Sequence, residues 1–175
     1  MSSRQLSDLV PKAEENANRI IALCKERGVD LLVYCTLRTL EEQAQLFRRG
    51  RTKAQIDAKL TSLRRQGYTE LADIIVQVGP QPGGPIVTYA APGESWHNFG
   101  EAFDAVPLVT GKAVWTNGPQ YRIYGEAVRS VGMNWAGDWQ GFSELPHAQL
   151  RTGSNPLAAL GPDAVRSLLK AGGLL

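Results

Sequence analysis

Residues 95–104 read SWHNFGEAFD, and they are the most informative stretch of the chain. The stretch contains His97, one of only two histidines in the protein, and Asp104 seven residues later. Gly100 lets the backbone approach a neighbouring segment closely, and Ala102 is small enough to pack beneath the polar side chains. Residues 102–109 form an apolar run that predicts a buried strand. The stretch therefore leads from a turn carrying a histidine into a core strand carrying a carboxylate.

The second histidine, His147, follows Glu144 by three residues in the sequence ELPH. A turn with this spacing allows both side chains to face one site. Catalytic zinc takes three protein ligands from His, Asp or Glu and leaves a fourth position for water. His97, Asp104 and His147 supply one such set, with Glu144 left as a general base. Spacing alone equally allows the alternative, in which each histidine is a surface or core residue without a metal ion.

Composition restricts the class of protein. The chain has 175 residues, 43% of them hydrophobic and 21% charged, which is typical of one folded domain. A net charge of +2 is too small for a protein whose whole surface binds nucleic acid or membrane. No apolar run is long enough to span a membrane, and the first residues lack the apolar centre of a secretory signal. Cys24 and Cys35 are too few for a disulfide scaffold and are interpreted as small buried apolar residues.

Local patterns predict helices and strands in mixed order, which indicates an α+β fold. Apolar residues at three- and four-residue steps predict helices, and short runs of β-forming residues predict strands. The expected helices span residues 11–27, 39–49, two stretches between 56 and 75, 120–131 and 162–171. The expected strands span residues 29–37, 85–90, 102–109 and 133–136. The Pro- and Gly-rich residues 79–85 predict a loop.

The fixed positions of residues 95–104 follow the pattern Ser-x-His-x-x-Gly-x-Ala-x-Asp, which resembles the signature of zinc peptidases that cut peptidoglycan peptides. This family includes D-alanyl-D-alanine carboxypeptidases and dipeptidases and the L-alanyl-D-glutamate endopeptidases of phages. Its acid-x-x-His element corresponds to residues 144–147, and its Tyr/Cys-x-x-Arg-Thr-x-x-Glu-Gln element corresponds to residues 35–43. Further matches are GRT at 50–52, PIVT at 85–88 and WAGDW at 135–139. The resemblance covers residues 9–149.

The resemblance implies a hedgehog-like α+β fold, with helices around a small, mostly antiparallel sheet. It also implies one zinc ion per chain. The ligands would be His97, Asp104 and His147, and Glu144 would act first as general base and then as general acid.

The same resemblance implies further site residues. Arg38 would bind the substrate carbonyl or its oxyanion, because a guanidinium offers two parallel donors where negative charge develops. The alternative for Arg38 is an ordinary ion pair. Ser95 would place a hydroxyl near the substrate, and Asp138 would orient a ligand histidine, although a turn or capping role is equally open for each. Three tryptophans are candidates for the cleft or the core: Trp96, Trp135 and Trp139.

The chain departs from the family pattern at two places. Residues 53–84 form a helical, basic insert, and residues 48–70 carry a net charge of +5 against −3 for the rest of the chain. The insert would be a solvated decoration, a cap over the substrate groove or a patch that attracts the anionic cell envelope. Ala148 replaces the aromatic residue that usually follows the second histidine. We expect residues 1–150 to form the peptidase domain with this insert, and residues 151–175 to form an extension of the same domain with a short helix.

The motif combination is most similar to the phage endopeptidases, so we expect an endolysin that hydrolyses the L-alanyl-D-glutamate bond of the peptidoglycan stem peptide. The absence of a signal peptide agrees with an enzyme that is made in the host cytoplasm and released to the periplasm by a holin. We expect this enzyme to be a monomer. A carboxypeptidase or dipeptidase of this family is one alternative, and a non-catalytic zinc-containing binding domain is another. The presence of both Glu144 and Arg38 argues against a non-catalytic site. The few aromatic residues of the insert argue against nucleic-acid binding.

Overall fold

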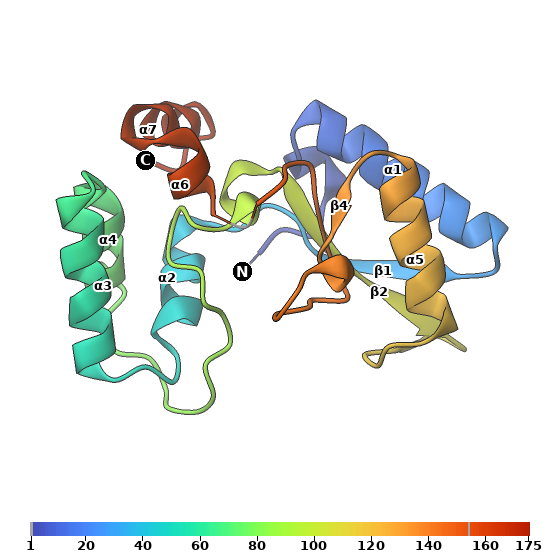
Figure 1. Ribbon diagram of the computed structural model, residues 1–175, viewed down its shortest axis with the longest axis horizontal. Helices are drawn as coiled ribbons and strands as arrows, with labels where there is room; N and C mark the ends of the chain where they lie inside the picture. The colour runs from blue at the N-terminus through green and yellow to red at the C-terminus, as the bar shows by residue number, and fades with distance from the viewer. Residues whose placement is uncertain (1, 154) are drawn as a thin grey trace. The chain divides into compact units, whose positions relative to one another are not determined.

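The computed structural model describes residues 2–153 and 155–175, which divide into two compact units (Figure 1). The sheet unit comprises Ser2–Leu37 and Gly100–Thr152. The helical unit comprises Arg38–Phe99 and Gly153–Leu175. Each unit thus combines segments that are distant in the sequence. The expected organisation as one domain with an insert at residues 53–84 stays a prediction.

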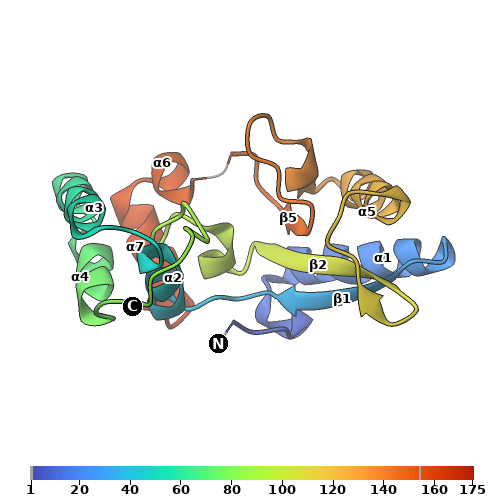
Figure 2. The same cartoon turned by 90° about the horizontal axis from the view of Figure 1, so that it is seen from below.

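Antiparallel strands form the centre of the sheet unit. Within the described residues the sheet order is β1-β2-β5-β4, and β3 pairs with β2. The strands are β1 (Asp30–Cys35), β2 (Ala102–Val109), β3 (Lys112–Ala113), β4 (Asn134–Trp135) and β5 (His147–Gln149). The long strands β1 and β2 lie side by side in Figure 2. This arrangement confirms the predicted α+β class with a small antiparallel sheet.

Helices α1 (Pro11–Glu26) and α5 (Pro119–Ser130) pack together against the sheet. From β2, Phe103 and Ala105 are fully buried in the core that these helices form. Successive side chains of a strand point to opposite faces, so Asp104 points away from the helices. Four fully buried residues of α1 have the helical spacing that the sequence shows: Ala13, Ala17, Ile20 and Cys24.

Gly100 has the backbone conformation that the sequence pattern requires. Its φ is +64°, and an added Cβ would lie 3.1 Å from the carbonyl oxygen of Asp8. The Gly100 carbonyl also accepts a hydrogen bond of 3.0 Å from the Val10 amide. A larger residue would therefore be strained and would push these two segments apart.

The helical unit contains the remaining longer helices of the described chain. They are α2 (Leu40–Arg48), α3 (Lys53–Arg65), α4 (Thr69–Gln77), α6 (Pro156–Leu160) and α7 (Pro162–Ala171), together with the short 3₁₀ helix η2 (Trp96–Phe99). Threonine hydroxyls cap two of the N-termini: Thr39 accepts from the Glu42 amide, and Thr52 forms a capping box with Gln55. The apolar faces of these helices share one buried core, which includes Leu40, Leu63, Leu71 and Leu169.

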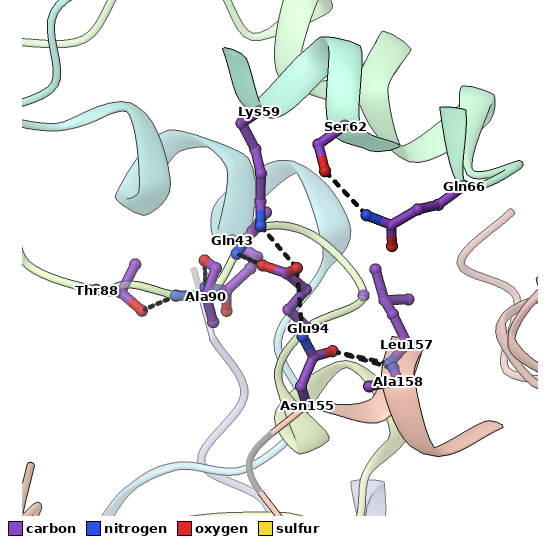
Figure 3. A network of polar contacts seen from close by, with 12 residues as sticks. Gln43, Lys59, Ser62, Gln66, Thr88, Ala90, Glu94, Asn155, Leu157 and Ala158 are labelled. Carbon is purple, nitrogen blue, oxygen red and sulfur yellow. Dashed lines mark hydrogen bonds and ion pairs between the residues drawn. The ribbon is translucent and has the colours of Figure 1, made fainter. Parts of the chain in front are cut away.

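The expected strand at residues 85–90 is wrong, because this segment is neither helix nor strand. Side chains, not a neighbouring strand, satisfy its backbone carbonyls. Arg51 donates to the Thr88 carbonyl at 2.7 Å, and Gln43 donates to the Ala90 carbonyl at 2.8 Å. The Thr88 hydroxyl accepts from the Ala90 amide at 3.2 Å (Figure 3). The apolar pattern indicated a strand, but these contacts with side chains replace the pairing that a strand needs.

Much of the positive charge at residues 48–70 is used inside the helical unit. Lys59 forms an ion pair of 2.7 Å with Glu94, whose carboxylate also contacts the Asn155 amide (Figure 3). Arg64 forms an ion pair of 2.9 Å with Asp73, and Arg48 donates to the Ile75 carbonyl at 2.8 Å. Several of these basic groups therefore serve to connect α2, α3 and α4 to their neighbours.

Among the described residues, no helix combines the length and apolarity needed to cross a membrane.

Candidate metal centre and catalytic site

Two of the predicted ligands, Asp104 and His147, face each other across neighbouring strands. They are partners in the register of β2 and β5, and His147 Nδ1 lies 3.0 Å from Asp104 Oδ1. Two donor atoms bound tetrahedrally to one zinc ion lie about 3.3 Å apart, given zinc bonds of roughly 2.0–2.1 Å. Both side chains are buried. The sheet therefore holds these two donors at a separation that suits a shared zinc ion.

The second nitrogen of His147 also has a neighbour. Nε2 lies 3.0 Å from Oε1 of Gln149, whose amide group donates to the Arg151 carbonyl. A neutral imidazole donates through one nitrogen only, so the other nitrogen keeps a lone pair for a metal ion. A ring held on both sides in this way has a defined orientation before any metal binds.

The third predicted ligand, His97, lies in η2 and is buried. Its carbonyl oxygen accepts a hydrogen bond of 3.1 Å from the Arg38 amide. The neighbouring Asn98 side chain donates to the Arg38 carbonyl at 2.9 Å and accepts from the Gly93 amide at 3.0 Å. The backbone on both sides of His97 is thus anchored, and Arg38 is joined directly to it.

The sheet unit holds one further donor. Cys35 of β1 is buried and is the register partner of Asp104 on β2, which in turn pairs with His147 on β5. A thiolate, an imidazole nitrogen and a carboxylate oxygen are all ordinary zinc donors, so this group fits zinc. The sequence marked Asp104 and His147 as ligands, whereas Cys35 was interpreted as a small buried residue that opens a family pattern, and not as a ligand.

A β-bulge explains how Cys35 comes to face Asp104. Val33 pairs with Ala105, but Cys35 pairs with Asp104, so β1 contains one residue more than β2 at this point. Such a bulge breaks the alternation of a strand and places two successive side chains, here Tyr34 and Cys35, on the same face. No local sequence signal marks this bulge.

A pocket of about 250 Å³ lies over the Asp104–His147 pair. It is lined by Tyr34, Asp104, Trp115 and residues 143–147, so it includes the predicted base Glu144. The Glu144 amide donates to the Ala136 carbonyl, and the His147 amide donates to the Glu144 carbonyl, each at 3.2 Å. This turn places Glu144 and His147 in the same pocket, as their three-residue spacing predicted.

The hydroxyl of Tyr34 remains protonated in this pocket. Burial raises the pKa of Tyr34 above its usual range, and the nearby carboxylates of Asp104 and Glu144 raise it further. Each of these causes disfavours a phenolate. Tyr34 therefore offers a hydroxyl that can donate a hydrogen bond in the pocket that the predicted general base also lines. No sequence motif marked this residue.

A buried glutamine positions the guanidinium of Arg38. Arg38 Nη1 donates to Gln43 Oε1 at 2.9 Å, and Gln43 Nε2 donates to the Ala90 carbonyl at 2.8 Å. Gln43 is fully buried, and Figure 3 shows it beside Ala90. The contact with Ala90 fixes which end of the amide accepts from Arg38. The sequence marked Gln43 only as part of a family pattern, and the structure gives it a positioning role.

The other predicted residues have mixed surroundings. Ser95 is partly buried, and its carbonyl accepts from the Asn98 amide in a turn. Asp138 forms an ion pair with Arg129, whose Nη1 donates to both carboxylate oxygens at 2.8 and 3.0 Å. The Ser95 contact agrees with the turn role left open for it, whereas the Asp138 contact is an ion pair and not a turn or a cap.

The three candidate tryptophans lie in different surroundings. Trp96 is buried and donates to the Gly153 carbonyl, and Trp135 lies in the core of the sheet unit. Trp139 lies beside the His147 ring, with 5.6 Å between the ring centroids. Trp139 therefore contacts a predicted ligand.

Comparison with known proteins defines the class. Residues 89–150, which carry all three predicted ligands, match the family model described as D-alanyl-D-alanine carboxypeptidase. Together with a donor group that fits zinc, this match makes the protein a zinc metallopeptidase.

Particular relatives are L-alanyl-D-glutamate peptidases. The chain is 29% identical over 153 residues to the peptidoglycan L-alanyl-D-glutamate endopeptidase CwlK of Bacillus subtilis (strain 168), covering 82% of this chain and 74% of that protein. It is 22% identical over 151 residues to the L-alanyl-D-glutamate peptidase of Listeria phage A118, covering 85% of this chain but 40% of that protein. Among solved structures, the Serratia marcescens L-Ala D-Glu endopeptidase ChiX matches with a TM-score of 0.46 and 20% identity, covering 86% of this chain and 89% of that chain.

Proposed function

We propose that the protein is a peptidoglycan endopeptidase that hydrolyses the L-alanyl-D-glutamate bond of the stem peptide. The observation that carries the proposal is the pocket that Glu144 lines together with the buried Asp104–His147 pair. The similarity to CwlK supports the choice of bond. His97 would complete the predicted ligand set, and Cys35 is an additional donor beside Asp104 in the sheet.

The residues of the pocket divide the chemical work. When bound, zinc supplies a Lewis acid that polarises the scissile carbonyl and makes water more acidic. Glu144 is exposed at the pocket, so we assign to its carboxylate the proton transfer from the attacking water to the leaving amine. Arg38 would donate from its guanidinium to the developing oxyanion, with its orientation maintained by Gln43.

The bond is tested by digestion of purified peptidoglycan with the zinc-loaded protein. Mass analysis with end-group labelling should find new carboxyl ends on L-alanine and new amino ends on D-glutamate. The family model that matches residues 89–150 describes a carboxypeptidase, so release of D-alanine is the specific alternative. Free D-alanine without new D-glutamate amino ends would overturn the endopeptidase proposal.

Arg38→Ala is expected to lower kcat about 10²–10³-fold, because it removes a donor to the oxyanion. Arg38→Lys should recover little of this loss, since a point charge does not replace two parallel donors. Gln43→Leu should give a smaller loss of the same kind, and Gln43→Glu, which keeps an acceptor for Arg38, should retain more activity. Steady-state kinetics on a soluble stem peptide measure these effects. Unchanged kcat in Arg38→Ala would contradict the oxyanion role.

Thermal unfolding provides the control for the Gln43 variants. Gln43→Leu leaves the buried Ala90 carbonyl without its donor, which costs about 1–3 kcal/mol of stability. The kinetic comparison should therefore be made well below the unfolding temperature of each variant.

We also propose that this activity serves phage-mediated lysis of a bacterial host. In this setting the enzyme is made in the host cytoplasm and reaches periplasmic peptidoglycan through a holin. Similarity to the peptidase of Listeria phage A118 supports this setting.

A further inference from the structure

An exposed aromatic side chain forms one wall of the pocket. Trp115 lines the pocket and is 61% exposed. Its ring meets Tyr34 of β1 edge to face, with 5.5 Å between centroids and 62° between planes. Tyr34 therefore supports the indole, while most of the Trp115 side chain stays open to solvent. A large aromatic held open beside a predicted catalytic base is a ready surface for a ligand.

The pocket also has acidic lining residues. Asp104 and Glu144 contribute carboxylates, and none of the lining residues is Lys or Arg. A bound zinc ion would offset the charge of its ligand Asp104, but Glu144 is not a predicted ligand and repels an anionic group placed beside it. The pocket therefore suits an uncharged group that has an apolar face.

The groups on the two sides of the scissile bond differ in charge. On its C-terminal side, D-glutamate carries a free α-carboxylate. On its N-terminal side, L-alanine is joined through an uncharged lactyl amide to N-acetylmuramic acid. The N-terminal side therefore presents no carboxylate, and it carries a sugar ring whose C–H groups are attracted to the negative face of an aromatic ring.

We propose that Tyr34 and Trp115 form a subsite for the N-acetylmuramyl group on the N-terminal side of the scissile bond. The apolar face of the sugar lies on the Trp115 indole, and the Tyr34 hydroxyl donates to an oxygen of the lactyl or acetyl group. The pocket is smaller than the roughly 300–1,000 Å³ of sites for drug-sized ligands, which suits a single sugar. This inference rests on the proposed function, because it places the muramyl side of the stem peptide in this pocket.

Binding of two matched probes tests the subsite without any cleavage. The probes are N-acetylmuramyl-L-alanine and D-lactyl-L-alanine, which is the same molecule without the sugar. Calorimetry on the zinc-loaded protein should show about tenfold tighter binding of the muramyl probe, as expected for one well-placed aromatic contact. Trp115→Ala should remove this preference and leave the affinity for D-lactyl-L-alanine unchanged.

Variants of neighbouring side chains provide the controls. Trp115→Phe should keep part of the preference. Leu32→Ala removes an exposed apolar side chain of β1 that does not line the pocket, and it should have no effect. Equal affinity of the wild-type protein for both probes, or unchanged preference in a folded Trp115→Ala variant, would overturn the subsite. Digestion products decide the proposed bond separately, so failure of one proposal is distinguishable from failure of the other.

Discussion

Glu144→Gln is expected to lower kcat about 10²–10⁴-fold while zinc content and stability stay unchanged. The substitution removes the group that transfers the proton and keeps the size of the side chain. Glu144 is exposed, and its turn is closed by backbone hydrogen bonds that glutamine retains. Metal analysis, thermal unfolding and kinetics on a soluble stem peptide test the three parts of this expectation.

The matched control is Ser143→Ala, because Ser143 precedes Glu144 in the same turn and lines the same pocket. We expect this variant to keep most of the activity, since its hydroxyl contacts the Gly137 carbonyl in the loop. Loss of zinc from Glu144→Gln would identify Glu144 as a ligand and remove the general-base assignment.

His97→Ala and His147→Ala are each expected to lose stoichiometric zinc and, with it, about a thousandfold or more in kcat. The reason is that Lewis-acid stabilisation of the transition state contributes several kcal/mol. Metal analysis after dialysis and activity with added zinc measure the two effects. Full zinc occupancy in both variants would contradict the predicted site.

Cys35→Ser separates the predicted ligand set from the alternative that the structure adds. If His97, Asp104 and His147 hold the ion, the variant keeps zinc at one per chain. If the Cys35 thiolate is needed, zinc is lost from the variant. A cobalt-substituted protein gives a second measurement, because a thiolate ligand adds a charge-transfer absorption that Cys35→Ser would remove.

Local sequence was sufficient for most of the fold. Helix α1 and strand β2 were predicted within a few residues, because their apolar side chains repeat at the spacing of one helix or one buried strand. The predicted strand at residues 85–90 failed because Arg51 and Gln43, distant in the sequence, satisfy its carbonyls. Periodicity does not show which partners a backbone finds.

Some residues of the candidate site could be predicted from the sequence, and others could be found only in the tertiary structure. Sequence motifs by themselves determined that His97, Asp104, His147 and Glu144 form the candidate set, because the residue types and their spacing are local properties. Only the tertiary structure decided that Cys35, Tyr34 and Trp115 join them. Their positions depend on a bulge in β1 and on the pairing of β1 with β2, which bring together segments far apart in the chain. Strand register is set by packing of the whole sheet, so no short stretch of sequence specifies it.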